Sequence, residues 1–78
     1  MPQSARNIRF GTCMQLLRWK APDVAEQLGC APALVQRWAG RGPRPLEPPE
    51  AVMEWLEELA QAIRRYPPPP AVEWRSRA

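Results

Sequence analysis

The sequence predicts an all-α protein of four helices followed by an extended, proline-rich C-terminal tail. Three observations lead to this prediction. Apolar residues recur at spacings of three and four, which is typical of amphipathic helices. No stretch of useful length alternates between apolar and polar residues as a half-buried strand would. The 11 prolines among the 78 residues fall mostly between the apolar segments, where a proline can begin or end a helix without interrupting it.

The first predicted helix spans Ile8–Trp19. We expect Asn7 or Thr12 to cap its N-terminus, because these side chains can accept a hydrogen bond from the backbone of the first turn. The apolar residues that carry the helical spacing are Phe10, Cys13, Met14 and Leu17. They predict the face that this helix turns toward the core.

Two short helices are predicted next, each introduced by a proline and closed by a glycine. The first follows Pro22 and ends at Gly29, and the second follows Pro32 and ends at Gly40. Proline suits the first turn of a helix, and glycine suits the position just beyond the last turn. The basic segment that continues from Gly40 to Pro45 is predicted to form a loop.

The strongest helical pattern covers Glu50–Tyr66. Acidic residues near its start and arginines near its end suit the helix dipole. Its apolar stripe consists of Val52, Leu56, Leu59 and Ile63, widened by Trp55, Ala62 and Tyr66. Four consecutive prolines then end the helix, so we expect a folded domain over residues 1–66 and a tail of polyproline type over residues 67–78.

The composition argues against catalysis and metal binding. The chain has no histidine and only two cysteines, Cys13 and Cys30. A Cys/His zinc site within one chain is therefore excluded, as are Ser-His-Asp and Cys-His mechanisms. We expect a binding module rather than an enzyme, with no cofactor, metal or small-molecule ligand. The sequence has neither a signal-peptide pattern nor a membrane-spanning apolar run, so we expect a cytoplasmic protein.

The formal net charge of +3 is unevenly distributed along the chain. Residues 1–46 hold seven basic and two acidic residues, whereas residues 47–78 hold four basic and six acidic residues. The N-terminal part thus carries +5 and the C-terminal part −2. A polyanionic partner for the N-terminal part explains this asymmetry. Ordinary solubilising charge is the alternative, and it accounts for the total charge more easily than for the asymmetry.

The two short helices and the turn between them predict a helix-turn-helix motif. Ala25 falls on the inner face of the first short helix, where a large side chain would push the second helix away. Gly29, four residues later, allows a sharp turn. Val35 and Trp38 form the inner stripe of the second helix. Two short helices joined by a tight glycine turn are the hallmark of this motif.

This pattern resembles the helix-turn-helix of phage Cro and repressor-type regulators. The matching residues are Ala25, Gly29, Cys30, Val35 and Trp38, and the segment Val35–Gly40 is similar to the end of the recognition helix in small bacterial and phage members. The resemblance covers residues 8–63 and implies a lambda-repressor-like fold with double-stranded DNA as the partner. Phage anti-CRISPR-associated autoregulators are similar in size and in their proline-terminated last helix. Pro32 departs from the pattern, because it stands where such proteins often place a base-contacting polar residue.

Helical geometry predicts which residues would contact DNA. With Val35 and Trp38 turned inward, the opposite face of their helix is exposed, and in a helix-turn-helix this face enters the major groove. We expect base contacts from Ala33, Gln36 and Arg37, and phosphate contacts from Lys20, Arg41 and Arg44. Free, solvated surface charge is the alternative for the basic residues. Whether Arg6 and Arg9 reach a minor groove is left open.

The last predicted helix has more apolar surface than a three-helix core needs. We expect the surplus to contact a second copy of the chain in a C2 dimer, through Trp55, Leu59, Ala62 and Tyr66. The sequence thus predicts a sequence-specific transcriptional regulator that represses its own gene by occluding the promoter. The alternatives are a DNA-binding adaptor, such as a phage packaging or recombination-directionality factor, and an antitoxin-like protein-interaction module.

Overall fold

A computed structural model describes residues 3–69 of the chain. This part contains four α-helices and no β-strand. The helices are α1 (Ala5–Leu17), α2 (Ala21–Leu28), α3 (Pro32–Trp38) and α4 (Glu50–Arg65). The predicted all-α class with four helices is therefore confirmed. None of these helices combines the length and the apolar character needed to cross a membrane. Residues 67–69 follow α4 without helical structure, and the rest of the predicted tail, with Trp74, lies outside the described residues.

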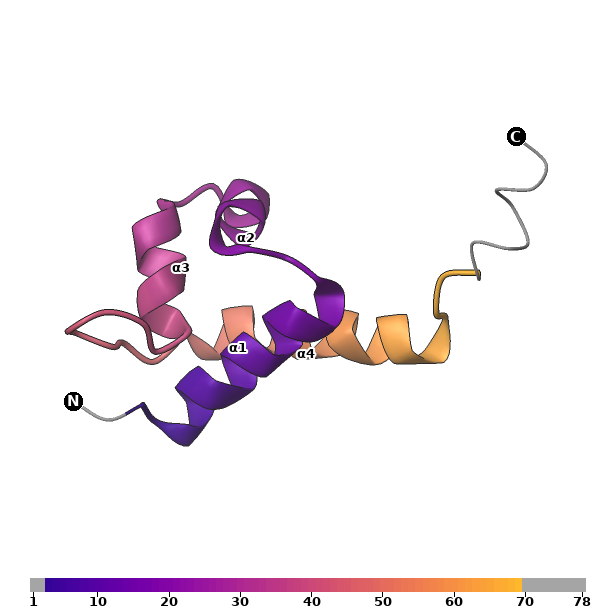
Figure 1. Cartoon of the computed structure of the whole chain (residues 1–78), viewed down its shortest axis with the longest axis horizontal. Helices are drawn as coiled ribbons and strands as arrows, with labels where there is room; N and C mark the ends of the chain where they lie inside the picture. Colours follow the sequence, from indigo (N-terminus) through magenta and orange to yellow (C-terminus); the bar gives the residue numbers. More distant parts are fainter. Residues whose placement is uncertain (1–2, 70–78) are drawn as a thin grey trace.

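The helices associate as two pairs (Figure 1). α1 packs against α4, α2 packs against α3, and α3 also contacts α1. In Figure 1 the first pair forms a lower layer, and α2 and α3 lie above it. The segment between α3 and α4 projects at one end of the molecule, on the same side as the first described residues, and the last turns of α4 project at the opposite end.

α1 begins earlier than the sequence predicts, because Ser4 caps it. The Ser4 Oγ accepts a hydrogen bond from the Asn7 backbone N–H (3.1 Å), and the Asn7 Oδ1 accepts one from the Ser4 backbone N–H (2.9 Å). This reciprocal pair is a capping box, which satisfies N–H groups that have no partner within the helix. The prediction that Asn7 or Thr12 is the N-cap is therefore wrong. Thr12 lies within the helix, where its hydroxyl donates to the Ile8 carbonyl oxygen (3.0 Å).

The core lies where the two pairs of helices meet. Each helix contributes a side chain with no exposed surface: Phe10, Val24, Val35 and Leu56, in chain order. Trp38 packs edge-on against Phe10, with ring centroids 6.0 Å apart and ring planes at 71°, an arrangement that aromatic pairs prefer. The predicted burial of Phe10 and Trp38 is confirmed, as is the inward orientation of Val35 and Trp38 on α3.

The buried stripe of α4 differs from the predicted one. The buried residues are Met53, Leu56 and Ala60, whereas Val52, Leu59 and Ile63 are only half-buried. Of the predicted stripe, Leu56 alone is buried. The reason is that α4 packs on α1, so the surface of α1 decides which line of α4 is covered. Apolar periodicity indicates an amphipathic helix but locates the centre of its buried face less well.

Shortening the side chain of Leu56 should strongly destabilise this small core. Leu56→Ala removes a fully buried side chain, so we expect the free energy of unfolding to fall by about 3 kcal/mol, within the usual range for such a change. Leu16→Ala is the matched control, because Leu16 is 36% exposed, and it should lower stability by less than about 1 kcal/mol. Urea unfolding followed by circular dichroism measures both. Equal losses would contradict the placement of Leu56 in the core.

Candidate nucleic-acid interface

A tight turn joins α2 to α3, and the two short helices pack against each other. Gly29 adopts a left-handed conformation (φ +70°), which L-residues with a Cβ adopt at a steric cost. The Cys30 backbone N–H donates to the Ala25 carbonyl oxygen (3.0 Å), which satisfies a carbonyl at the end of α2. Ala25 is buried, 2% exposed, at the face predicted to meet α3. The local turn thus has the form that the glycine predicts.

The outer face of α3 is exposed, as helical geometry predicts. Ala33, Gln36 and Arg37 all lie on the surface, and so does Pro32 at the first position of the helix. Gln36 and Arg37 are therefore the hydrogen-bonding side chains on this face. The front of α3 offers only proline and alanine.

A basic loop, residues 39–47, follows α3 and is fastened back onto it. The Gly40 backbone N–H donates to the Arg37 carbonyl oxygen (3.0 Å), and the Arg41 N–H donates to the Gln36 carbonyl oxygen (2.9 Å). With Gly40 at φ +79°, this pair of bonds is a Schellman motif. Farther along, the Leu46 N–H also donates to the Arg37 carbonyl oxygen (3.0 Å). Both ends of the basic loop are therefore held at the last turn of α3.

Arg37 has a role in this loop that the sequence did not reveal. Its side-chain Nε–H donates to the backbone carbonyl oxygen of Arg44 (2.9 Å). The guanidinium of the residue predicted to contact a base thus also supports the residue predicted to contact phosphate. The bond uses the Nε–H, one of the five N–H donors of the side chain.

The predicted contact residues of α3 and the basic loop line one shallow surface hollow. It is bordered by Ala33, Gln36, Arg37, Arg41 and Arg44, together with Gly42 and Pro43. The first five are five of the six residues predicted to contact DNA. The three arginines are exposed, and none forms an ion pair within residues 3–69. This hollow therefore brings together three arginines that form no ion pair within residues 3–69.

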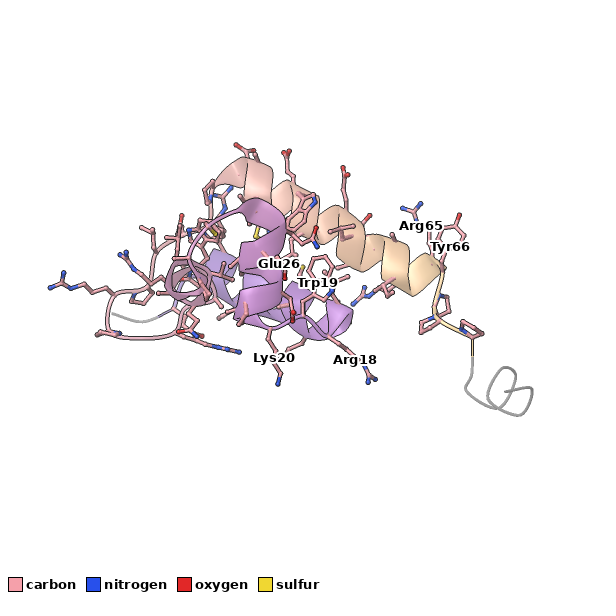
Figure 2. The ribbon with its side chains drawn as sticks, turned by 90° about the horizontal axis from the view of Figure 1, so that it is seen from above. Arg18, Trp19, Lys20, Glu26, Arg65 and Tyr66 are labelled. Atoms are coloured by element: carbon pink, nitrogen blue, oxygen red, sulfur yellow. The ribbon has the colours of Figure 1, made fainter. Side chains whose placement is uncertain are left out.

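The sixth predicted contact residue, Lys20, does not line this hollow. It lies at the N-cap of α2, where its backbone N–H donates to Asp23 Oδ2 (2.8 Å). Its side chain is exposed and projects on the same side of the molecule as that of Arg18 (Figure 2).

Arg9, considered above for a minor groove, forms an ion pair with Glu57. This pair links α1 to α4.

The residues predicted to form the dimer lie on α4, from its middle to its C-terminal end. Ala62 and Tyr66 are exposed, Tyr66 by 76%, whereas Trp55 and Leu59 are half-buried. Trp55 packs against Trp19, with ring centroids 6.0 Å apart. Part of the surplus apolar surface is thus used within the chain. The exposed remainder lies at the C-terminal end of α4, where Figure 2 places Tyr66.

A second hollow lies between α1 and α4 and includes the Cys13 side chain in its lining. It is lined by Arg9, Thr12, Cys13, Leu16, Glu57, Ala60, Gln61 and Arg64. Burial raises the pKa of the Cys13 thiol, and the nearby Glu57 carboxylate raises it further, while Arg9 and Arg64 act in the opposite direction. The thiol is therefore protonated at neutral pH, which is unfavourable for a nucleophile. Residues 3–69 contain no cluster of three potential metal ligands.

The sequence analysis gave Gln3 no role and considered Asn7 only as a helix cap, yet both contact the segment that follows α3. The Gln3 Nε2–H donates to the Gly40 carbonyl oxygen (3.0 Å), and Asn7 is the one buried polar side chain in the described part of the chain. A signal for Asn7 was present, because it stands three residues before Phe10, in line with the apolar stripe of α1. A polar residue on a buried stripe has to find hydrogen-bond partners.

Comparison of the chain with protein-family models, with curated proteins and with solved structures finds no match. The assignment of a role to this surface depends on its own geometry and charge.

Removing the Arg37 side chain should loosen the basic loop. Arg37→Ala deletes the bond to the Arg44 carbonyl oxygen, so trypsin should cut after Arg41 several-fold faster, because proteolysis depends on local opening. Mass spectrometry of a digestion time course follows this cleavage, and Arg44 is not cut because a proline follows it. Arg65→Ala, an exposed arginine at the end of α4, is the control. Equal cleavage rates in both variants would contradict the supporting role of Arg37.

Proposed function

We propose that the chain binds double-stranded DNA through α3 and the basic loop and acts as a sequence-specific transcriptional regulator. The observation that carries this proposal is the gathering of Gln36, Arg37, Arg41 and Arg44 around one exposed hollow without acidic partners within residues 3–69. An unpaired cluster of arginines on one face is the electrostatic footprint of a nucleic-acid-binding surface. The glutamine beside them adds a side chain that can read a base edge.

The arrangement of α2 and α3 supports a helix-turn-helix reading of this surface. Val35 and Trp38 hold α3 to the core, and its opposite face is free to enter a major groove. In that geometry Gln36 and Arg37 face the base edges. Arg41 and Arg44 follow the recognition helix on the basic loop, where phosphate contacts fix the orientation on the duplex. The resemblance to Cro and repressor-type regulators agrees with this assignment.

A C2 dimer completes the proposal. The exposed end of α4, with Ala62 and Tyr66, contacts a second copy, so that two copies of α3 read two half-sites about one helical turn apart. Such a dimer bound at a promoter represses by occlusion and needs no further domain, which makes autoregulatory repression the simplest mechanism.

One observation favours a second candidate, a DNA-binding adaptor with little sequence preference. Pro32 and Ala33 are exposed at the front of α3 and offer no polar side chain to a base. Specific recognition then depends on Gln36 and Arg37. Competition with random-sequence duplex separates the two candidates, because a regulator binds its operator typically at least 10³-fold more tightly than random DNA and an adaptor does not.

Salt titration of duplex binding tests the proposed contacts. The logarithm of the affinity should fall linearly with the logarithm of the salt concentration, by about 0.9 per phosphate contact. Arg44→Ala should weaken binding to all sequences and lower this slope by about 0.9. Gln36→Ala should leave the slope unchanged and lose about 1–3 kcal/mol of discrimination at one base pair. Fluorescence anisotropy with labelled duplexes measures both effects.

Arg65→Ala is the matched control for charge, because it removes an exposed arginine at the far end of α4. It should keep both the affinity and the slope of the unaltered chain. The absence of detectable duplex binding at low salt would refute DNA binding and leave the protein-interaction module as the alternative. Equal effects of Arg44→Ala and Gln36→Ala would refute the separate phosphate and base roles.

The dimer is tested most cleanly at Ala62. Ala62→Glu introduces a charge into the proposed interface and should shift the mass in sedimentation equilibrium from dimer to monomer. Ala51→Glu is the matched control, because Ala51 is exposed at the opposite end of α4, and it should leave the mass unchanged. Trp55→Glu is less informative, since it also disrupts the contact with Trp19. A dimer that persists in Ala62→Glu would contradict this interface.

A further inference from the structure

The side chain of Asn7 is buried and uses its full hydrogen-bonding capacity. It is 2% exposed. Its Nδ2 donates to the carbonyl oxygens of Trp38 (2.8 Å) and Leu46 (2.9 Å). Its Oδ1 accepts from the backbone N–H of Ser4 (2.9 Å) and from the Ser4 hydroxyl (2.9 Å). An asparagine amide has two N–H donors and two acceptor positions, so every one of them is occupied.

The two carbonyl groups that Asn7 binds lie at the two ends of the basic loop. Trp38 is the last residue of α3, immediately before the loop, and Leu46 is near the end of the loop. One amide group of α1 therefore spans the base of the loop and joins its ends. The tip of the loop, which carries Arg41 and Arg44, is therefore anchored at both ends.

Gln3 adds a second attachment to the same loop. Its Nε2 donates to the Gly40 carbonyl oxygen (3.0 Å). The contact is so close that a Cβ built on Gly40 would lie 2.6 Å from the Gln3 Cγ. Asn7 lies in the first turn of α1 and Gln3 just before its N-cap. Neither residue lines the hollow formed by α3 and the basic loop.

We propose that Asn7 is a positioning residue for DNA binding, which sets the affinity for duplex DNA through the basic loop without touching the DNA. This inference rests on the proposed function. A loop that is already ordered loses less conformational entropy when its side chains engage a ligand than a loop that has to be ordered on binding. In a loop that Asn7 does not order, this entropic cost offsets the gain from the phosphate contacts of Arg41 and Arg44, and the two contacts are not made.

Ser4→Asp is the control for charge, because it adds a negative charge next to Asn7 and leaves both Asn7 donors in place. Compared with it, Asn7→Asp is selective, because aspartate keeps the acceptor oxygens for Ser4 and loses both donors to the loop. The salt slope of duplex binding should fall by about 1.8, which corresponds to two phosphate contacts at about 0.9 each. Cleavage by trypsin after Arg41 should become faster. Circular dichroism and a thermal melt establish that binding is measured on the folded chain.

A double-mutant cycle separates positioning from general stability. Arg41→Ala/Arg44→Ala removes the two contacts directly, and we expect the same loss of affinity and slope as in Asn7→Asp. Combining all three substitutions should cause no further loss, because the contacts can be lost only once. A purely structural Asn7 would instead leave the slope of the folded fraction unchanged and make the losses additive.

Gln3→Ala keeps the proposal testable where Asn7→Asp does not fold. Gln3 is exposed, so its substitution removes the bond to Gly40 with little effect on the core. We expect faster cleavage after Arg41 and a smaller salt slope than in Gln61→Ala, a matched control on α4. If the unaltered chain binds duplex DNA while the folded Asn7→Asp variant, or Gln3→Ala in its place, keeps the original slope, the positioning role is refuted and the proposed function stands. If the unaltered chain binds no duplex DNA, both are refuted together.

Discussion

The hydrogen bonds of one buried amide, that of Asn7, connect three parts of the chain that are far apart in sequence. They reach the N-cap of α1 at Ser4, the last turn of α3 at Trp38 and the end of the basic loop at Leu46. In a buried environment an amide without partners costs a substantial fraction of the stability of a small domain. The core and the candidate interface are therefore coupled, because the Asn7 side chain is buried in the first and bonded to the loop of the second.

The candidate nucleic-acid interface and the exposed end of α4 lie at opposite ends of the described part of the chain (Figure 1). The arginines of α3 and the basic loop lie at one end without ion pairs in residues 3–69, and the exposed end of α4 lies at the other (Figure 1). Between them, Arg9 and Glu57 join α1 to α4 and neutralise each other. The surface proposed to bind DNA and the surface proposed to contact a second copy are thus far enough apart to be used at the same time.

Local sequence signals predicted the middle of the chain better than its two long helices. Pro32 and Gly29 delimit α3 and α2 through their own backbone preferences, and Val35 and Trp38 then define the inner face of α3. The predicted start of α1 is too late, because Ser4 stands before the apolar pattern begins. Its capping role becomes visible only with its partner, Asn7. The buried line of α4 was displaced for a related reason, since α1 decides which side of α4 it covers.

The sequence by itself determined the helical class, the short helices with their proline and glycine boundaries, and the residues exposed on α3, because these follow from backbone preferences and helical periodicity. Only the tertiary structure decided that Gln36, Arg37, Arg41 and Arg44 meet around one hollow, and that Asn7, Gln3 and the Arg37 side chain hold the loop that carries two of them. These contacts join residues up to 39 positions apart. No local pattern encodes such a pairing, because a polar side chain finds its partners only after the core has brought distant segments together.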